Sequence, residues 1–218
     1  MESVLDRVIK QNTENVNLLK TKDYNIFSVL QIQSKEVLIC RMIADLLNPR
    51  GQHGAGAEYL KIFMRDCLGM EKMDTKLADQ AIVTAEYAID DERRIDIVIE
   101  IGSYFLPIEV KIYAADQKSQ CFDYYQYAKR RDAQAKVYYL TLDGHRPGKD
   151  STSSGSQSVP EEDIVCLSFR EHILNWLKAC KNCGNTGMIP ILEQFIHNIE
   201  QISGYTSEKV RNLSLIHI

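Results

Sequence analysis

The sequence predicts an α/β fold in which helices flank a mixed sheet of about five strands. Three consecutive segments, 82–89, 94–101 and 105–112, show the composition and two-residue alternation of strands and predict a meander with tight turns. Two further apolar segments, 136–142 and 164–169, follow after a helical segment that is typical of a crossover connection. Helical spacing near both ends of the chain predicts additional helices outside the sheet.

The first third of the chain is expected to be helical. Residues 1–22 and 24–47 carry apolar side chains at helical spacing, and the Asn-Pro-Arg-Gly run at 48–51 is a clear stop signal. A flexible turn over 51–56 then precedes a third helix at 57–68.

The second half of the chain contains the crossover helix and a long loop. Asp116 is predicted as the N-cap of a helix over 117–131. The segment 143–160 contains three glycines, two prolines and five serines, and we expect a long mobile surface loop there. Helices at 171–180 and 189–202 complete the predicted pattern.

The length of 218 residues predicts one domain over the whole chain, 1–218, with its core at about 30–170. The parts outside that core are the expected N-terminal helix, 1–22, and the C-terminal helices within 171–218. The apolar run at 213–218 has no cap after it, so we expect a helix or strand that is cut short there.

The composition excludes some classes of protein. The net charge of −4 argues against a sequence-nonspecific DNA coat protein, but not against an enzyme, which needs only a local cluster of basic groups. The polar N-terminus and the lack of long apolar runs predict a cytoplasmic protein with no membrane partner and with six reduced cysteines. The oligomeric state is not predicted.

One predicted hairpin gathers three charged side chains. The isoleucines of 94–101 alternate with other residues, so Asp96 lies on the face away from them. The Gly-Ser pair at 102–103 is typical of a two-residue loop, and in that register Asp96 lies opposite Glu109, with their Cβ atoms about 4.5–5.5 Å apart. Lys111 follows two residues later and projects from the same face.

Carboxylates this close repel each other, and in a partly buried site one of them would take up a proton. A divalent cation removes the conflict, and Mg²⁺ prefers hard oxygen ligands. The alternative is an ordinary cross-strand network of Asp, Glu and Lys on a solvated face, which the spacing alone favours.

Two further observations favour a metal site. Glu36 lies in the middle of the apolar stripe of the 24–47 helix, where a carboxylate needs a metal-bound water, a lysine or backbone donors as partner. Gln120 and Tyr124 share one face of the 117–131 helix. The simpler alternatives are a core hydrogen bond for Glu36 and a solvated Gln beside a packing Tyr.

Together, these residues resemble the signature of the PD-(D/E)XK nuclease superfamily, which has the restriction-endonuclease-like fold. Asp96, followed after twelve residues by Glu109-Val-Lys111, is similar to its main motif. Gln120 and Tyr124 are similar to the QxxxY motif of its RecB-like branch.

The resemblance covers roughly residues 30–170 and leaves the later helices unexplained. The segment 46–54 is similar to a loop of an uncharacterised bacterial subgroup. Ile95 replaces the proline that often precedes the motif aspartate.

The resemblance implies a metal centre. Asp96, Glu109 and the carbonyl of Val110 would ligate Mg²⁺, with Mn²⁺ as an alternative ion. Lys111 would orient or help deprotonate the attacking water and offset phosphate charge. Glu36 would hold a metal-bound water or a second metal. No organic cofactor is expected, since the sequence has no dinucleotide-binding or P-loop motif.

Supporting roles follow from the same resemblance. Gln120 and Tyr124 would position Lys111 or the backbone phosphate. Glu86 is a lesser candidate for the acidic cluster, with a surface salt bridge to Arg93 or Arg94 as an equal alternative.

Nucleic acid, with DNA as the expected substrate, is the implied partner. The residues expected to contact phosphates are basic groups at a helix end, basic groups in the 143–160 loop, and a histidine in the glycine-rich turn: Lys129, Arg130, Arg131, Arg146, Lys149 and His53. For the lysines and arginines the alternative is ordinary solvated charge, and for His53 it is stabilisation of its turn.

The predicted function is therefore that of a Mg²⁺-dependent nuclease that hydrolyses phosphodiester bonds. The alternative is a catalytically silent domain of the same fold that binds nucleic acid or protein.

Overall fold

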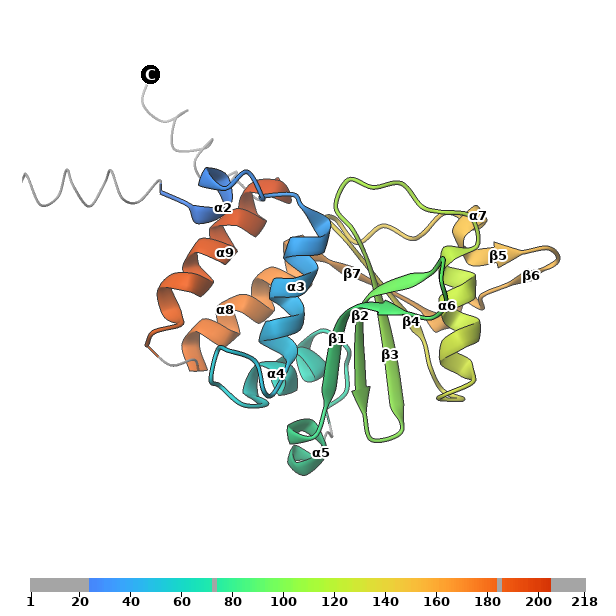
Figure 1. Cartoon of the computed structure of the whole chain (residues 1–218), viewed down its shortest axis with the longest axis horizontal. Coiled ribbons are helices and arrows are strands. Elements are labelled where there is room, and N and C mark those ends of the chain that lie inside the picture. Colours follow the sequence, from blue (N-terminus) through green and yellow to red (C-terminus); the bar gives the residue numbers. More distant parts are fainter. Residues whose placement is uncertain (1–23, 72–73, 184–185, 205–218) are drawn as a thin grey trace, which may run out of the picture.

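A computed structural model describes residues 24–71, 74–183 and 186–204 (Figure 1). The expected helix at 1–22 and the apolar run at 213–218 lie outside these residues. A five-stranded sheet with the order β1-β2-β3-β4-β7 forms the centre of the fold. Its strands are β1 (Ile82–Ala88), β2 (Arg94–Ile101), β3 (Tyr104–Lys111), β4 (Val137–Thr141) and β7 (Ile164–Ser168).

The sheet is mixed, as the sequence predicts. β1, β2 and β3 pair antiparallel, whereas β4 pairs parallel with β3 and β7 pairs parallel with β4. The parallel pairing brings the carboxyl ends of β3, β4 and β7 to one edge of the sheet.

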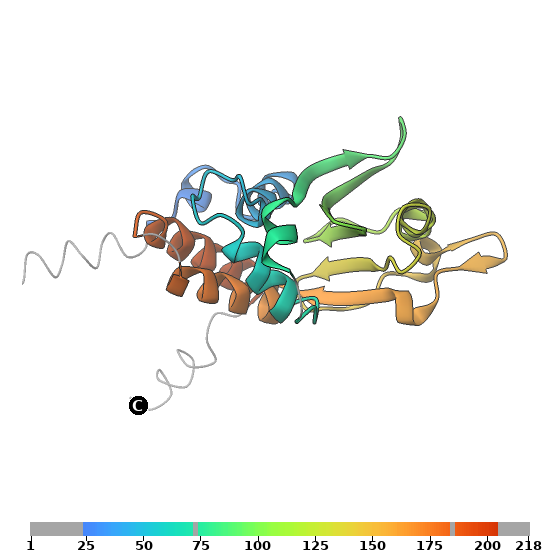
Figure 2. The same ribbon diagram turned by 90° about the horizontal axis from the view of Figure 1, so that it is seen from below.

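Helices cover both faces of this sheet. One side carries α3 and α4 from the first half of the chain together with α8 and α9 from its end, and the other side carries α6 (Figures 1 and 2). The bounds are α3 (Glu36–Leu47), α4 (Glu58–Asp66), α6 (Gln120–Lys129), α8 (Leu174–Cys183) and α9 (Ile189–Ile202). A short α5 (Thr75–Asp79) precedes β1, and a π-helical turn (Phe169–Ile173) leads into α8.

Strand alternation divides the apolar side chains between two cores. In β3, Leu106 and Ile108 join the large core under α3, α4, α8 and α9, whereas Phe105 packs with the residues under α6. β3 therefore buries both of its faces, which is typical of a strand between helical layers.

The alternation of β2 is interrupted near its start. Ile97 faces the large core as predicted, but Ile95 joins the α6 side, where it was not expected. Across from Asp96, Glu86 of β1 has a φ of 54° and takes no part in the strand pairing. The distortion of β1 at this point explains why the faces of β2 do not alternate regularly through Asp96.

The single helix expected over 24–47 is wrong, because the chain forms two helices there. A one-turn α2 (Ile26–Val29) ends before Gln31, whose φ of 55° is incompatible with a continuing helix. Phe27 of α2 stacks on Phe195 of α9 at 5.3 Å between ring centroids. Packing against α9 therefore determines the direction of this segment.

The predicted N-cap of α6 is also wrong. Ser119, with a φ of 57°, precedes the helix. Asp116 instead accepts hydrogen bonds from the Tyr139 hydroxyl at 2.8 Å and from the Gly148 amide at 2.7 Å. Asp116 thus joins three segments of the chain.

The 143–160 segment contains regular structure that the sequence did not predict. It includes α7 (Lys149–Thr152) and a small hairpin of β5 (Ser153–Ser154) and β6 (Gln157–Ser158), followed by a 3₁₀ turn (Glu161–Asp163). The Ser119 amide donates a hydrogen bond to the Asp150 carbonyl at 2.7 Å, so the segment is attached to the start of α6. In the part of the chain that the structure describes, no helix has both the length and the apolar character needed to cross a membrane.

Candidate active site

The β2–β3 hairpin brings Asp96 and Glu109 to neighbouring positions. Its two-residue loop sets the register that the sequence predicts, and the pairing runs as far as Ile97 with Ile108. Asp96 and Glu109 come next in this register. There the Asp96 Oδ2 atom accepts a hydrogen bond of 2.7 Å from the Val110 amide, so a side chain bridges the two strands where the main-chain pairing ends.

Glu109 and Lys111 form a buried ion pair at the end of β3. Their exposed fractions are 1% and 7%, and Glu109 Oε1 lies 2.5 Å from Lys111 Nζ. The other carboxylate oxygen, Glu109 Oε2, is buried and has no hydrogen-bond partner among the described residues. A buried carboxylate oxygen without a partner is unfavourable, so this atom is available to a ligand.

The electrostatics of the three groups follow from their burial and proximity. Burial, followed by the charge of Asp96, raises the pKa of Glu109 well above its usual value. Burial also raises the pKa of Asp96, although the Val110 amide and Lys111 act in the opposite direction. For Lys111, burial favours the neutral amine, but the neighbouring carboxylates outweigh it and the pKa is raised. Lys111 is therefore cationic near neutral pH.

Glu36 approaches this cluster from the first turn of α3. Its Oε2 atom accepts a hydrogen bond of 2.8 Å from the Ile112 amide, directly after Lys111. A backbone donor is thus one of the partners expected for Glu36, although the single 24–47 helix that placed it within an apolar stripe does not form. Cys40, one turn further along, is buried, and its pKa is raised by burial and then by the charges of Asp96 and Glu36.

Gln120 and Tyr124 are joined to each other and to β2. The Gln120 amide donates to the Tyr124 hydroxyl at 3.0 Å, and that hydroxyl donates to the Arg94 carbonyl at 2.5 Å. Burial, followed by the charge of Glu109, raises the pKa of Tyr124. The pair therefore lies near the cluster but holds the start of β2, and no hydrogen bond between described residues joins it to Lys111.

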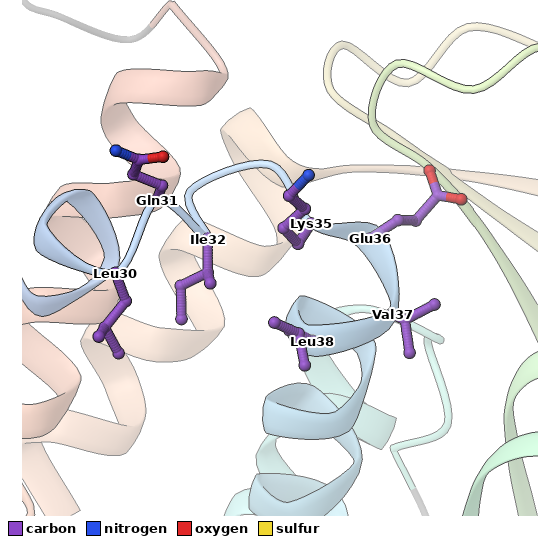
Figure 3. A pocket seen from close by; sticks show the side chains of 7 residues that line it. All are labelled: Leu30, Gln31, Ile32, Lys35, Glu36, Val37 and Leu38. Carbon is purple, nitrogen blue, oxygen red and sulfur yellow. The ribbon is translucent and has the colours of Figure 1, made fainter.

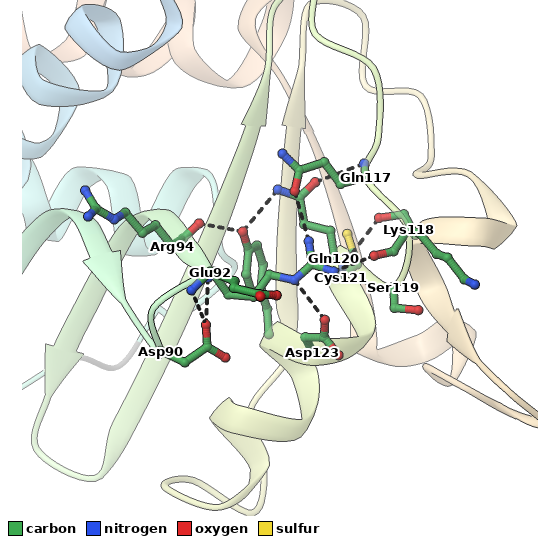
Figure 4. A network of polar contacts seen from close by, with 12 residues as sticks. Asp90, Glu92, Arg94, Gln117, Lys118, Ser119, Gln120, Cys121 and Asp123 are labelled. Atoms are coloured by element: carbon green, nitrogen blue, oxygen red, sulfur yellow. Dashed lines mark hydrogen bonds and ion pairs between the residues drawn. The ribbon is translucent and has the colours of Figure 1, made fainter.

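The sequence did not predict a second connection between α6 and β2. Arg93 contacts three groups at the start of α6: the Asp123 carboxylate at 3.0 Å, the Gln117 side chain at 2.9 Å and the Lys118 carbonyl at 2.6 Å. Figure 4 shows Gln117, Lys118 and Asp123 at the start of α6, with Arg94 on the adjacent β2. No sequence pattern pairs these residues, which are 24 to 30 positions apart.

Glu86 pairs with neither of the arginines considered from the sequence. Its partner is Arg41 of α3, whose Nη2 atom lies 2.5 Å from Glu86 Oε2. The prediction of a salt bridge to Arg93 or Arg94 is wrong, because α3 crosses β1 and brings a different arginine to this position.

His53 is buried within its turn, with an exposed fraction of 1%. Its Nδ1 atom accepts a hydrogen bond from the Ala55 amide at 3.1 Å, its Nε2 atom lies 2.9 Å from the Asn48 carbonyl, and its ring stacks on Tyr59. These contacts stabilise the turn and leave little of the ring accessible from the surface.

The basic residues at the end of α6 lie far from Gln120. Lys129 is separated from it by nine residues, or roughly 13 Å of helix. Lys129 forms a salt bridge with Asp163 at 3.2 Å, and Arg131 forms one with Glu100 at 3.1 Å. Arg130 and Arg131 also lie against aromatic rings, so much of this basic surface is engaged within the protein.

The 143–160 segment begins at the sheet edge of the acidic cluster, but its Arg146 reaches Glu161, just before the start of β7 at the opposite edge. Lys111 and Thr141 are register partners in the parallel β3–β4 pair, and this segment follows β4. Arg146 donates a hydrogen bond to the Glu161 carbonyl at 3.1 Å, and Lys149 is exposed at the start of α7.

The donor set fits a hard divalent cation. Asp96 and Glu109 supply carboxylate oxygens, of which Glu109 Oε2 is buried without a partner, and Val110 between Glu109 and Lys111 supplies a carbonyl. Among the described residues, no three His, Cys, Asp or Glu side chains are grouped so that they could hold a metal ion. The proposed ligands include only two such side chains, because the third protein ligand is a backbone carbonyl.

Comparison with known proteins identifies one family. The model of the PD-(D/E)XK nuclease superfamily matches residues 24–197. This range extends beyond the 30–170 expected from the motifs and includes α8 and much of α9. No curated protein and no solved structure matches the chain.

Proposed function

The chain belongs to the PD-(D/E)XK nuclease superfamily, and from that premise we propose that it is a divalent-metal-dependent nuclease that hydrolyses phosphodiester bonds in DNA. The observation that carries the proposal is the buried group of Asp96, Glu109 and Lys111 at one sheet edge, in which Glu109 Oε2 lacks a partner. Nucleases of this superfamily typically use divalent metals.

In this proposal, Asp96, Glu109 and the Val110 carbonyl hold Mg²⁺, or Mn²⁺ in its place. The bound cation would supply a Lewis acid that lowers the pKa of a water molecule and neutralises charge on the phosphoryl oxygens. Glu36, held by the Ile112 amide, presents its remaining oxygen to a water molecule or a second cation.

Lys111 acts as a fixed positive charge. Its pKa is raised by the surrounding carboxylates, which argues for an ammonium that orients the attacking water and offsets phosphate charge rather than for a base. The ion pair with Glu109 keeps the ammonium directed at the metal ligands.

Gln120 and Tyr124 act as positioning residues. The Tyr124 hydroxyl holds the Arg94 carbonyl, two residues before Asp96, and Gln120 orients that hydroxyl. This support fixes the part of β2 where its alternation is interrupted.

Phosphate contacts are assigned first to Lys149, with Arg146 as the second candidate, because their segment leaves the sheet at the edge where β3 ends. Lys129, Arg130 and Arg131 are less suited to this role, since they lie at the other end of α6.

The test is incubation of the full chain with supercoiled, linear and single-stranded DNA and with RNA, in Mg²⁺, Mn²⁺ or EDTA. We expect cleavage only with a divalent cation, and its loss in Asp96→Asn and Lys111→Ala. Glu100→Gln is the matched control. Glu100 lies on the same strand as Asp96, but its carboxylate pairs with Arg131 instead of joining the acidic cluster. Binding without cleavage of any substrate would replace this proposal with the silent binding domain.

A further inference from the structure

The side chain of Tyr113 is the most exposed large hydrophobic side chain in the part of the chain that the structure describes. Its exposed fraction is 69%. Within residues 24–71, 74–183 and 186–204, no hydrogen bond, ring contact or ion pair involves this side chain. Tyr113 therefore contributes little to the core, and its ring is available for a ligand.

Tyr113 lies at the rim of the candidate active site. It follows Lys111 by two residues, so the two Cα atoms are at most about 7 Å apart. The intervening Ile112 is fixed to Glu36 by the 2.8 Å hydrogen bond from its amide. The backbone directly before the exposed ring is thus attached to the acidic cluster.

The same rim continues into an apolar surface. A pocket of about 550 Å³ lies between α2 and α3 and is lined by Leu30, Gln31, Ile32, Lys35, Glu36, Val37 and Leu38. Figure 3 shows Glu36 on the side of α3 that faces the strands, away from Leu30 and Ile32. Leu30 is 57% exposed and Leu38 is 39% exposed. Glu36 therefore lies between the apolar pocket and the segment that carries Tyr113.

We propose that the Tyr113 ring stacks on an unpaired nucleobase next to the phosphate that is cleaved. The proposal rests on the nuclease function and specifies its substrate as a single strand, or a duplex locally opened at the cut. Every base has a π-face that an exposed aromatic ring can stack on, but within a duplex that face is covered by the neighbouring base. Lys111 contacts the phosphate, and the ring two residues later receives the adjoining base.

The test measures binding without cleavage. The full chain in EDTA is titrated into single-stranded and duplex oligonucleotides that carry the fluorescent base 2-aminopurine. We expect Tyr113→Ala to weaken binding of the single strand by about 10-fold or more and to abolish the quenching of 2-aminopurine that stacking causes. Tyr113→Trp should retain both, because the larger ring stacks equally well.

Tyr104 provides the matched control. It is 40% exposed and begins β3, about 23 Å of strand away from Lys111. Tyr104→Ala should leave oligonucleotide binding unchanged. An equal loss in Tyr104→Ala, no loss in Tyr113→Ala, or an equal loss for the duplex would overturn the stacking assignment. A shift of the Tyr113→Ala variant in sedimentation, with unchanged oligonucleotide binding, would assign the ring to contact between two copies of the chain instead.

Failure of this inference is distinguishable from failure of the nuclease proposal. If Tyr113→Ala changes neither cleavage nor oligonucleotide binding, the stacking proposal alone is overturned. Tyr113-dependent binding by a chain that cleaves nothing overturns the nuclease assignment and leaves the stacking in place.

Discussion

The Tyr124 hydroxyl donates a hydrogen bond of 2.5 Å to the Arg94 carbonyl, and so connects α6 to β2 two residues before Asp96. The bond crosses the α6 side of the sheet, where both Tyr124 and the neighbouring Ile95 are buried. One side chain therefore links the QxxxY positions to the strand that carries the first motif carboxylate.

Removing this hydroxyl should slow catalysis without unfolding the protein. We expect Tyr124→Phe to reduce the cleavage rate about 10- to 100-fold, because a supporting contact to a ligand-bearing strand is lost. The free energy of unfolding should fall by only about 1 kcal/mol. Tyr125→Phe is the control, since the Tyr125 hydroxyl donates a bond of 2.7 Å to Asp163, away from β2. A similar loss of activity in both variants would contradict a positioning role for Tyr124.

Acid should weaken the stabilisation that a divalent metal provides. The pKa values of Asp96 and Glu109 are both raised by burial, so protons compete with the cation above the usual carboxyl range. In the metal-free protein these groups favour the folded state below their unfolded pKa, and that contribution is lost as pH rises through the folded values. A cation should therefore raise the melting temperature more at about pH 8 than at about pH 5.

Thermal unfolding with Mn²⁺ or EDTA at both pH values measures this difference. The chain with Asp96→Asn and Glu109→Gln together should show no metal-dependent shift at either pH. An equal shift at both pH values in the unaltered chain would count against these two carboxylates as metal ligands.

Arg131 should matter for stability rather than for cleavage. Its guanidinium lies 4.8 Å from the Tyr127 ring and 5.1 Å from the Phe105 ring, and it pairs with Glu100. We expect Arg131→Ala to lower the free energy of unfolding by about 1–2 kcal/mol, because packing and cation–π contacts are lost. Chemical denaturation measures the change, and the cleavage rate of the folded fraction should stay within about twofold. A large loss of cleavage with unchanged stability would place Arg131 in substrate binding instead.

The salt dependence of binding should reveal which basic residues contact phosphates. Each phosphate contact that is removed lowers the slope of log affinity against log salt by about 1. We therefore expect Arg146→Ala and Lys149→Ala each to reduce the slope. Lys129→Ala and Arg130→Ala, at the opposite end of α6, should leave it unchanged. The reverse result would assign the nucleic acid to the other edge of the sheet.

The sequence by itself determined the strands, their register and the charges of the β2–β3 hairpin. The Gly-Ser pair allows only a short loop, and a two-residue loop leaves one register for the two strands. That register places Asp96 beside Glu109, with Lys111 on the same strand as Glu109. These features depend on neighbours in the chain, which is why a local pattern was sufficient.

Only the tertiary structure decided what surrounds that hairpin. The break between α2 and α3 depends on packing against α9, and the partners of Arg93 and Asp116 come from segments more than twenty positions away. The pairing of Glu36 with the Ile112 amide likewise joins residues 76 positions apart. Contacts of this kind depend on how the helices pack across the sheet. That packing is stabilised by many side chains together. No single residue spacing in the sequence therefore predicts these contacts.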